Sequence, residues 1–435
     1  MKIIGIIAEY NPFHNGHAYQ IKKIKENLQA DYVVVAMSGN FVQRGAPAII
    51  DKYARTEMAL SCGADLVIEL PVLWATASAE AFAMAGVTLF DKMGCVDGIC
   101  FGAETDDIST LTMLSSILVE EPDAYRTMLS SYLKEGMAFP AARSIALCDY
   151  VTMFPSTNPM NDFTKNNSVP LDYISTILNE PNNILAIEYL KALKRRNSRI
   201  TPHVIKRQGA GYHDKTIAIS NDNIITASAT AIRNVLDTTF IKLEDSLSTA
   251  MPTTALDVLN NYITTHAFVS STDFSSILGY KLLTSSTSTL AEIGDSNTDI
   301  ANRFFKNRMF FSSFEQFCEL NKSKDVTYTR ICRILLHLIL NIHNEDYQIG
   351  KDVDYIPYLR ILGFCKESAP LLKELKNTSQ VPIISKLADA SSYLNEQALF
   401  LLEKDIFAAD LYSQICANKI SQFASSEYTK PIIRL

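Results

Sequence analysis

The sequence contains no run of about eighteen consecutive apolar residues, the length that a membrane-spanning helix needs. Its first apolar run, residues 3–8, is too short for the core of a signal peptide and is followed directly by Glu9. We therefore expect a cytosolic protein. Eight cysteines are present, but none forms a C-x-x-C pair or stands beside a histidine at metal-binding spacing. This scatter predicts free thiols rather than disulfides or a structural zinc site.

An excess of basic residues is also missing, because the formal net charge of the 435 residues is −7. This charge excludes a surface that is positive throughout, but local basic clusters can still bind nucleic acid. Hydrophobic residues make up 47% of the chain and charged residues 20%, which is typical of a folded globular protein rather than a disordered one. The length predicts about two or three domains.

The amino terminus has the pattern of a strand, a polar loop and a helix. Residues 2–8 are mostly apolar and β-branched, as in a buried strand of a parallel sheet. Residues 11–16 are rich in turn formers, and from His17 onwards apolar residues recur at the spacing of one helix face. A loop at the carboxyl end of a parallel strand is a common ligand site, and the free N–H groups of the following helix favour an anion.

Two histidines occupy this loop in the order His-x-Gly-His, as His14 and His17 around Gly16. The glycine leaves room for a phosphate beside the backbone, and the two imidazoles can donate hydrogen bonds to it from either side. Two histidines at a helix start also occur as ordinary surface caps, so the motif alone leaves both interpretations open. Its position directly after a buried strand favours the phosphate site.

The strand–loop–helix pattern then repeats. Residues 31–38 predict a second buried strand, residues 65–71 a third and residues 96–101 a fourth, with helices over 51–62 and 75–93 between them. The fold class is therefore α/β, with a Rossmann-like, doubly wound parallel sheet. The loop after the second strand either faces the same crevice as the first loop or is a solvated connection. Its polar side chains are Ser38, Asn40, Gln43 and Arg44.

The middle of the chain predicts two helices over 108–148, a loop-rich segment over 150–181, and an amphipathic helix over 181–196 with an asparagine cap. A strand over 201–206 leads to Arg207. The next pattern, residues 226–233, places the hydroxyls of Ser228 and Thr230 at a helix start, with Arg233 one turn later. Such a start is an ordinary cap in many proteins, but hydroxyls and a guanidinium can also hold a pyrophosphate leaving group.

Beyond about residue 245 the alternation of strands and helices stops, and repeating helical patterns predict a mostly α-helical domain. Basic residues within 303–333 are interleaved with aromatic ones. This mixture suits either a helix pair that buries its aromatics and solvates its charges, or a surface that binds RNA phosphates and an unstacked base. The basic residues are Arg303, Lys306, Arg308, Lys322, Lys324, Arg330 and Arg333.

The two anion-binding patterns give the chain a resemblance to a known family. The H-x-G-H string after a first strand, followed about two hundred residues later by S-x-T-x-I-R at 228–233, resembles the nucleotidyltransferase superfamily. The longer string from Gly5 to His17 is similar to one branch, the tRNA(Met) cytidine acetate ligases. Further strings at 181–185, 206–214, 328–337, 358–364 and 382–386 extend this resemblance over nearly the whole chain. Compared with that family, residues 150–181 contain an insertion.

The resemblance implies an ATP-dependent ligase that activates acetate as acetyl-AMP and transfers the acetyl group to N4 of the wobble cytidine of elongator tRNA(Met). It implies a nucleotidyltransferase-like catalytic domain over 1–240 and a helical, tRNA-binding domain over 241–435, with Mg²⁺ accompanying ATP. The implied catalytic residues are His14, His17, Ser228, Thr230 and Arg233. The implied nucleotide-binding residues are Ile7, Ala8, Glu9, Tyr10, Asn11, Pro12, Phe13, His14, Asn15, Gly16, His17, Gly102, Asn182 and Arg207, with Asn183 as a neighbour.

Two other functions remain open from the sequence. A small-molecule nucleotidyltransferase would use the same motifs to join a nucleotide to a phosphorylated metabolite, and its helical half would serve oligomerisation. A nucleotide-gated tRNA-binding module would bind ATP and RNA without releasing pyrophosphate, although its catalytic motifs would then be unused.

Overall fold

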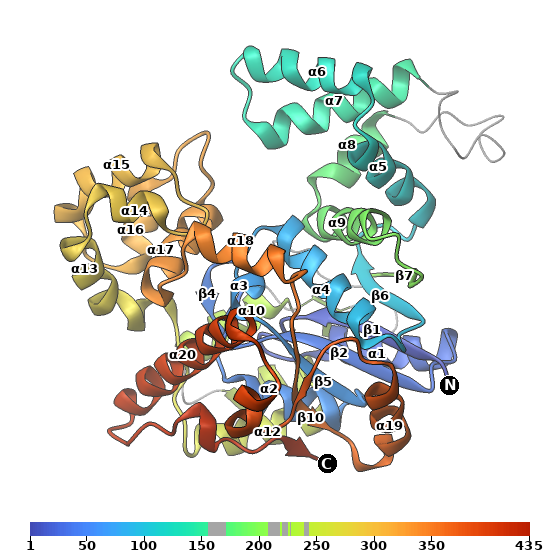
Figure 1. Ribbon diagram of the computed structural model, residues 1–435, viewed down its shortest axis with the longest axis vertical. Helices are drawn as coiled ribbons and strands as arrows, with labels where there is room; N and C mark the ends of the chain where they lie inside the picture. The colour runs from blue at the N-terminus through green and yellow to red at the C-terminus, as the bar shows by residue number, and fades with distance from the viewer. Residues whose placement is uncertain (155–170, 208–217, 220–224, 227, 239–242) are drawn as a thin grey trace. The chain divides into compact units, whose positions relative to one another are not determined.

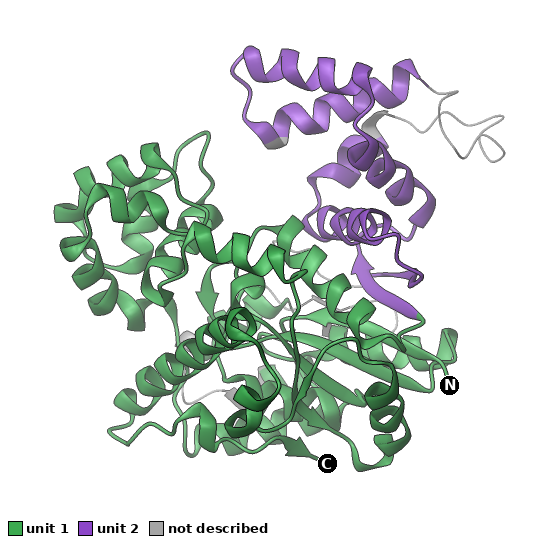
Figure 2. Cartoon of the chain, viewed as in Figure 1, with its two compact units in different colours: residues 1–97, 208–435 green, residues 98–207 purple. Residues whose placement is uncertain are grey.

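The computed structural model describes residues 1–154, 171–207, 218–219, 225–226, 228–238 and 243–435 (Figure 1). Most of the loop-rich part of the predicted insertion, and residues 208–214 of the string at 206–214, lie outside the described residues. The chain divides into two compact units (Figure 2). The first unit comprises residues 1–97 and 208–435, and the second comprises residues 98–207.

The first unit contains a mixed sheet whose three central strands are parallel (Figure 1). In pairing order its strands are β11 (Ile383–Ile384), β10 (Leu359–Phe364), β5 (Leu66–Leu70), β2 (Tyr32–Ser38) and β1 (Ile3–Ala8). Strand β10 is antiparallel to β5, and β12 (Ile433–Arg434) pairs with β10. Two small hairpins lie apart from this sheet: β3 (Phe41–Val42) with β4 (Ala46–Pro47), and β8 (Ala218–Ile219) with β9 (Ile225–Thr226).

Three helices follow the parallel strands of the first unit as predicted: α1 (Asn15–Asn27), α2 (Lys52–Ser61) and α4 (Ala79–Met93). A short helix that was not predicted, α3 (Val72–Ala75), precedes α4. The strands between them are buried, with Val33 to Met37 fully inaccessible, because helices cover a parallel sheet on its faces. The later helices are α10 (Ala229–Thr238), α11 (Leu243–Ala250), α12 (Thr253–Ile263), α13 (Ser275–Thr284), α14 (Thr287–Glu292), α15 (Thr298–Asn307), α16 (Phe314–Asn321), α17 (Tyr328–Leu340), α18 (Asn344–Asp352), α19 (Ala369–Thr378) and α20 (Glu396–Lys419). The predicted class, a Rossmann-like parallel sheet with a mostly helical region, is confirmed.

The second unit contains two parallel strands, β6 (Gly98–Ala103) and β7 (Thr201–Lys206). Between them lie α5 (Ile108–Glu120), α6 (Asp123–Lys134), α7 (Phe139–Met153), α8 (Leu171–Asn179) and α9 (Pro181–Arg195). The prediction of two helices over 108–148 was wrong, because three helices begin there. Pro122 ends α5 and precedes the first turn of α6, a position where its missing N–H does no harm.

Strand β10 is the main element that sequence patterns failed to predict. Apart from Arg360 its residues are apolar, and a short run of this kind cannot be distinguished from a buried helix segment by periodicity. It joins the sheet through a buried ionic network. Nζ of Lys52 lies 2.7 Å from carboxylate oxygens of both Glu69 and Glu427, and Arg360 lies 2.9 Å from Glu69. The carboxyl-terminal region is thereby part of the same core as the first strands.

Another buried carboxylate, that of Asp405, connects α20 to α3. Asp405 accepts hydrogen bonds from the Val72 N–H at 2.6 Å and from the Tyr358 hydroxyl at 2.7 Å. Burial, with a further contribution from Glu69, raises the pKa of Asp405 to about 7. Because of this raised pKa, Asp405 binds a proton more tightly in the folded state than in the unfolded state.

We therefore expect the stability contributed by Asp405 protonation to be complete below about pH 4, the ordinary aspartate pKa, and to be lost as the pH rises through about 7. The melting temperature of the wild type should fall relative to that of Asp405→Asn over this range. Thermal unfolding of both proteins at a series of pH values measures the difference. A difference that stays constant from pH 4 to pH 8 would contradict the raised pKa.

Candidate functional site

The loop after β1 is organised by its two histidines. His14 caps α1, and its Nδ1 accepts the Gly16 N–H at 3.1 Å. Nδ1 of His17 in turn accepts the His14 N–H at 3.2 Å. Because Nδ1 accepts a hydrogen bond in each ring, the neutral imidazoles carry their protons on Nε2. Each ring therefore has an Nε2–H donor, as phosphate binding requires.

The two imidazoles stack on each other rather than standing on opposite sides of Gly16. Their centroids are 3.7 Å apart with an interplanar angle of 22°, and the Tyr10 and Phe13 rings pack against His17. A Cβ at Gly16 would lie 2.9 Å from Cε1 of His14, so only glycine leaves space for this stack. The sequence pattern predicted that the two imidazoles would donate hydrogen bonds from either side of a phosphate. In the structure the two rings instead lie nearly parallel, one stacked on the other.

The helix start at α10 meets this loop. Nη1 of Arg233 donates to the carbonyl of Asn11 at 2.7 Å, and its Nη2 donates to Oγ1 of Thr230 at 3.0 Å. Oγ of Ser228 accepts the Ala231 N–H at 3.1 Å, which caps the helix. The structure therefore brings together the two segments that carry the five residues predicted to be catalytic, although 222 positions separate Asn11 from Arg233.

Charges around this loop leave a surplus of positive groups. Burial lowers the pKa of Arg233, and it lowers that of Arg44 as well; Glu9 opposes both shifts, and Arg44 adds to the lowering at Arg233. Oε1 of Glu9 accepts the Gln43 N–H at 2.9 Å, so the second loop is held against the first. Two guanidinium groups and one carboxylate leave a net positive charge that favours an anionic ligand.

The second loop is shaped by contacts that the sequence did not reveal. The side chain of Asn40 accepts the Lys52 N–H at 2.7 Å and so satisfies a backbone donor in the first turn of α2. Gly45 has φ +78°, and a Cβ there would lie 2.3 Å from the backbone nitrogen of Arg333 in α17. The hairpin that carries Arg44 thus packs directly on the backbone of the helical region.

Arg55 is a structural residue of the site that sequence reasoning missed. Its fully buried guanidinium donates to the carbonyls of Glu9 at 2.6 Å and Ser38 at 3.1 Å. It also donates to the carbonyls of Ile50, at 3.1 Å, and Gly39. An arginine inside the helix predicted over 51–62 gives no sequence signal of such a role.

The other residues predicted from the opening loop have different surroundings. The side chain of Ile7 packs against α4, where a Cβ at Gly86 would lie 2.4 Å from it. Nδ2 of Asn15 donates to the Thr249 carbonyl at 2.8 Å. Phe13 is fully buried.

The second unit holds the remaining predicted nucleotide-binding residues close together. Nδ2 of Asn182 donates to Oε1 of Glu104 at 2.6 Å, and the Arg207 N–H donates to the Ala103 carbonyl at 2.9 Å. A Cβ at Gly102 would lie 3.3 Å from Cγ of Arg207. Burial lowers the pKa of Arg207, and Glu104 opposes this shift. Gly102, Asn182 and Arg207 therefore lie close together in one site. Glu104 is a further residue of this site, which the sequence pattern did not predict.

The asparagine predicted as the cap of α9 has another role. The N-cap residue is Glu180, and its side chain makes no capping hydrogen bond. Oδ1 of Asn183 instead accepts the N–H groups of Glu104 and Thr105, at 2.9 and 3.2 Å. The prediction of an asparagine cap was therefore wrong. The side chain of Asn183 instead holds the loop after β6 in place.

Most of the cations expected to form a basic surface have partners within the protein. Arg330 and Arg333 form ion pairs with Asp295, at 3.2 and 2.7 Å, and Arg303 donates to the Asn321 carbonyl. Arg308 donates to the Phe305 carbonyl and stacks on its ring, and Lys322 pairs with Glu319. These contacts favour a structural role for much of the cluster.

In the part of the chain that the structure describes, no three His, Cys, Asp or Glu side chains converge as metal ligands. Among the described helices, none combines the length and the apolar character that crossing a membrane requires.

Known proteins resemble this chain along its whole length. A tRNA(Met) cytidine acetate ligase of Thermoanaerobacter sp. (strain X514) is 41% identical over 436 residues, and one of Clostridium perfringens (strain SM101) is 41% identical over 434 residues; each match covers 100% of both chains. Two crystal structures of Thermotoga maritima TmcAL also cover 100% of both chains. The apo form is 30% identical with a TM-score of 0.89, and the form bound with alpha-thio ATP is 29% identical with a TM-score of 0.88.

The family model described as HIGH Nucleotidyl Transferase matches residues 1–427. The match includes the H-x-G-H loop and the helix start at Ser228 that meets it. The chain therefore belongs to the HIGH nucleotidyl transferase family.

Proposed function

We propose that this protein is an ATP-dependent tRNA(Met) cytidine acetate ligase. It activates acetate as acetyl-AMP and transfers the acetyl group to N4 of the wobble cytidine of elongator tRNA(Met), which forms N4-acetylcytidine. The observation that carries the proposal is the hydrogen bond from Arg233 to the Asn11 carbonyl, because it joins both phosphate-binding motifs in one site. The full-length relatives named as such ligases support the choice of substrates.

In the first step, an acetate oxygen attacks the α-phosphorus of ATP, and the bond to the pyrophosphate oxygen breaks. The reaction needs no protein nucleophile, so the protein acts by aligning the reactants and by stabilising the charge that develops on pyrophosphate. The Nε2–H groups of His14 and His17 donate to phosphate oxygens. Arg233, Thr230 and Ser228 bind the leaving pyrophosphate. Gly102, Asn182 and Arg207 are the nucleotide contacts proposed in the second unit, and the backbone of residues 7–17 offers those proposed in the first unit.

In the second step, the cytidine N4 amine attacks the acetyl carbonyl carbon, AMP leaves with the bonding electron pair, and the amine loses a proton. Residues 1–240 supply the chemistry, and residues 241–435 bind the tRNA. The described residues offer no three-ligand cage, so a Mg²⁺ ion would be held mainly by the phosphate oxygens of ATP. When bound, such an ion neutralises part of the triphosphate charge.

The direct test is incubation of the purified protein with ATP, acetate and elongator tRNA(Met), followed by nucleoside analysis. The proposal predicts N4-acetylcytidine only when all three substrates are present, and pyrophosphate exchange with ATP and acetate alone. A stable nucleotide conjugate formed whether or not tRNA is present would instead identify a small-molecule nucleotidyltransferase. ATP and RNA binding without either product would identify a binding module.

Replacing His17 with alanine should lower acetate-dependent pyrophosphate exchange by about 10²–10³-fold, because one preorganised donor to the phosphates is lost. The matched control is Lys22→Ala in the same helix, where the lysine side chain is 70% exposed. Exchange rates and melting temperatures of both variants decide the question. Near-normal exchange by a folded His17→Ala protein would refute the assignment.

Arg233→Lys keeps the positive charge but cannot reach the Asn11 carbonyl and the Thr230 hydroxyl with two prongs. We expect exchange to fall by about tenfold or more, and Arg233→Ala to fall further. Arg126→Lys, at an exposed guanidinium of α6, should leave the rate unchanged. Equal activity of the lysine and wild-type proteins would mean that two-pronged binding at this position is unimportant.

A further inference from the structure

A polar groove of about 840 Å³ lies in the first unit, beside β10. Strand β11 pairs with the beginning of β10 and β12 with its end, so the edge between them is uncovered by either strand. The segments that follow β11 and precede β12 form the walls. The lining includes Arg360, Ser385, Lys386, Tyr428, Lys430 and Arg434.

The floor of the groove is electrically balanced. Arg360 and Lys52 are buried there with Glu69 and Glu427, so two positive and two negative groups compensate each other. Burial raises the pKa of Glu427, but Lys52 and Arg360 lower it further, to about 2, so this carboxylate stays ionised. The buried network therefore adds no net charge to the groove.

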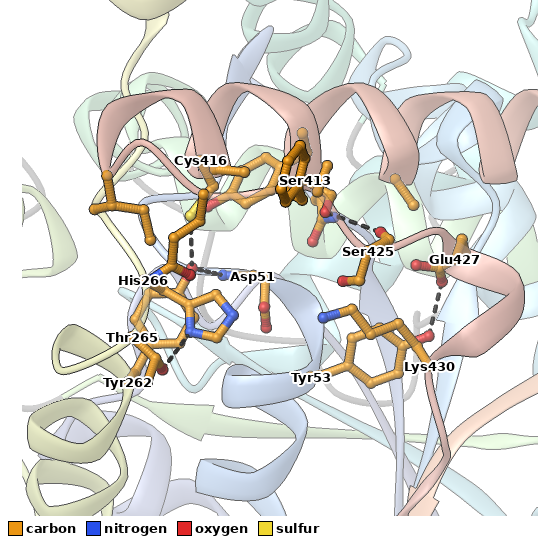
Figure 3. Close-up of a pocket in the computed structure, with 18 residues that line it drawn as sticks. Asp51, Tyr53, Tyr262, Thr265, His266, Ser413, Cys416, Ser425, Glu427 and Lys430 are labelled. Atoms are coloured by element: carbon orange, nitrogen blue, oxygen red, sulfur yellow. Dashed lines mark hydrogen bonds between the residues drawn. The ribbon is translucent and has the colours of Figure 1, made fainter.

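The walls carry a surplus of positive charge. Lys386 is paired with Asp389 at 3.7 Å, but Lys430 and Arg434 form no ion pair among the described residues. The guanidinium of Arg434 lies only over the Phe364 ring, at 5.8 Å. Lys430 also lines a second pocket, shown in Figure 3, in which the Tyr53 hydroxyl donates to Glu427 at 2.8 Å. Two cations are thus available to an anionic ligand.

The strand register places Arg360, at one end of this groove, at the same edge of the sheet as the proposed ATP site, whereas Arg434 pairs with Phe364, opposite the first residue of β5. Arg360 is opposite Glu69, Glu69 is opposite Met37, and Met37 is opposite Ala8, the last residue before the loop with His14. Three strand spacings separate Arg360 from Ala8, or about 15 Å. A single-stranded RNA loop that presents one base at the opening loop can reach this distance within a few nucleotides.

We propose that the groove binds backbone phosphates of the RNA substrate next to the target cytidine, with Lys430 and Arg434 as the contacting cations. This inference rests on the proposed function and names where its RNA partner is held. Tyr428, which is 55% exposed at the groove, offers a ring on which an unstacked base can stack. Charge complementarity to a phosphate chain favours RNA over a protein segment.

The test combines Lys430→Ala and Arg434→Ala in one variant of the full-length protein. Its matched control is Lys373→Ala with Lys376→Ala, which removes the same charge from two exposed positions of α19. Binding of fluorescently labelled elongator tRNA(Met) is measured at several salt concentrations. Acetate-dependent pyrophosphate exchange without tRNA is measured in parallel.

We expect the groove variant to bind tRNA about tenfold more weakly than the control at low salt. The slope of log K against log salt should decrease by about one for each cation removed. Exchange should match that of the control, because this reaction needs no RNA. A tRNA affinity and salt slope equal to those of the control would overturn the proposal.

The failure of the proposed function has a different signature, because wild-type protein would then show no acetate-dependent exchange. If the double variant loses exchange, the single variants Lys430→Gln and Arg434→Gln replace it. Wild-type tRNA affinity in both single variants would overturn the groove assignment. Weaker tRNA binding with intact exchange in either one would support it.

Discussion

The geometry of the site depends on one buried guanidinium. Arg55 donates hydrogen bonds to backbone carbonyls at the ends of β1 and β2, and a buried arginine must satisfy its donors in this way. The Glu9 carbonyl and the Gly39 carbonyl are consequently held by one side chain. The loop with His14 and the loop with Arg44 thus have fixed positions before any ligand binds, which is the preorganisation that transition-state stabilisation requires.

The helical half of the chain is built into the same core rather than appended to it. Strand β10 extends the sheet, Asp405 of α20 accepts the Val72 N–H, and α17 packs against Gly45 beside Arg44. Removal of the carboxyl-terminal half would therefore expose an edge of the sheet. It would also leave the buried charges of Lys52 and Glu69 without their partners Glu427 and Arg360. A tRNA bound to this half would lie on the same compact unit as the loops with His14 and Arg44.

Sequence patterns predicted what is local and missed what is formed between distant segments. The strand, loop and helix around His14 were predictable because hydrophobic periodicity and turn residues specify each of them. Strand β10 was not predictable, since its pairing with β5 depends on residues about three hundred positions away. The same holds for Arg55 and for Asn183, whose side chain binds the backbone of Glu104 and Thr105 instead of capping its own helix.

We propose that the opening loop and the start of α10 form a single triphosphate site. The hydrogen bond from Arg233 to Asn11 joins these two segments, and the stacked imidazoles lie on the same loop. A crystal structure of this protein with a non-hydrolysable ATP analogue measures the claim directly. We predict phosphate oxygens within hydrogen-bonding distance of Nε2 of His14 and His17 and of the Arg233 guanidinium. A triphosphate bound without contact to these groups would contradict it.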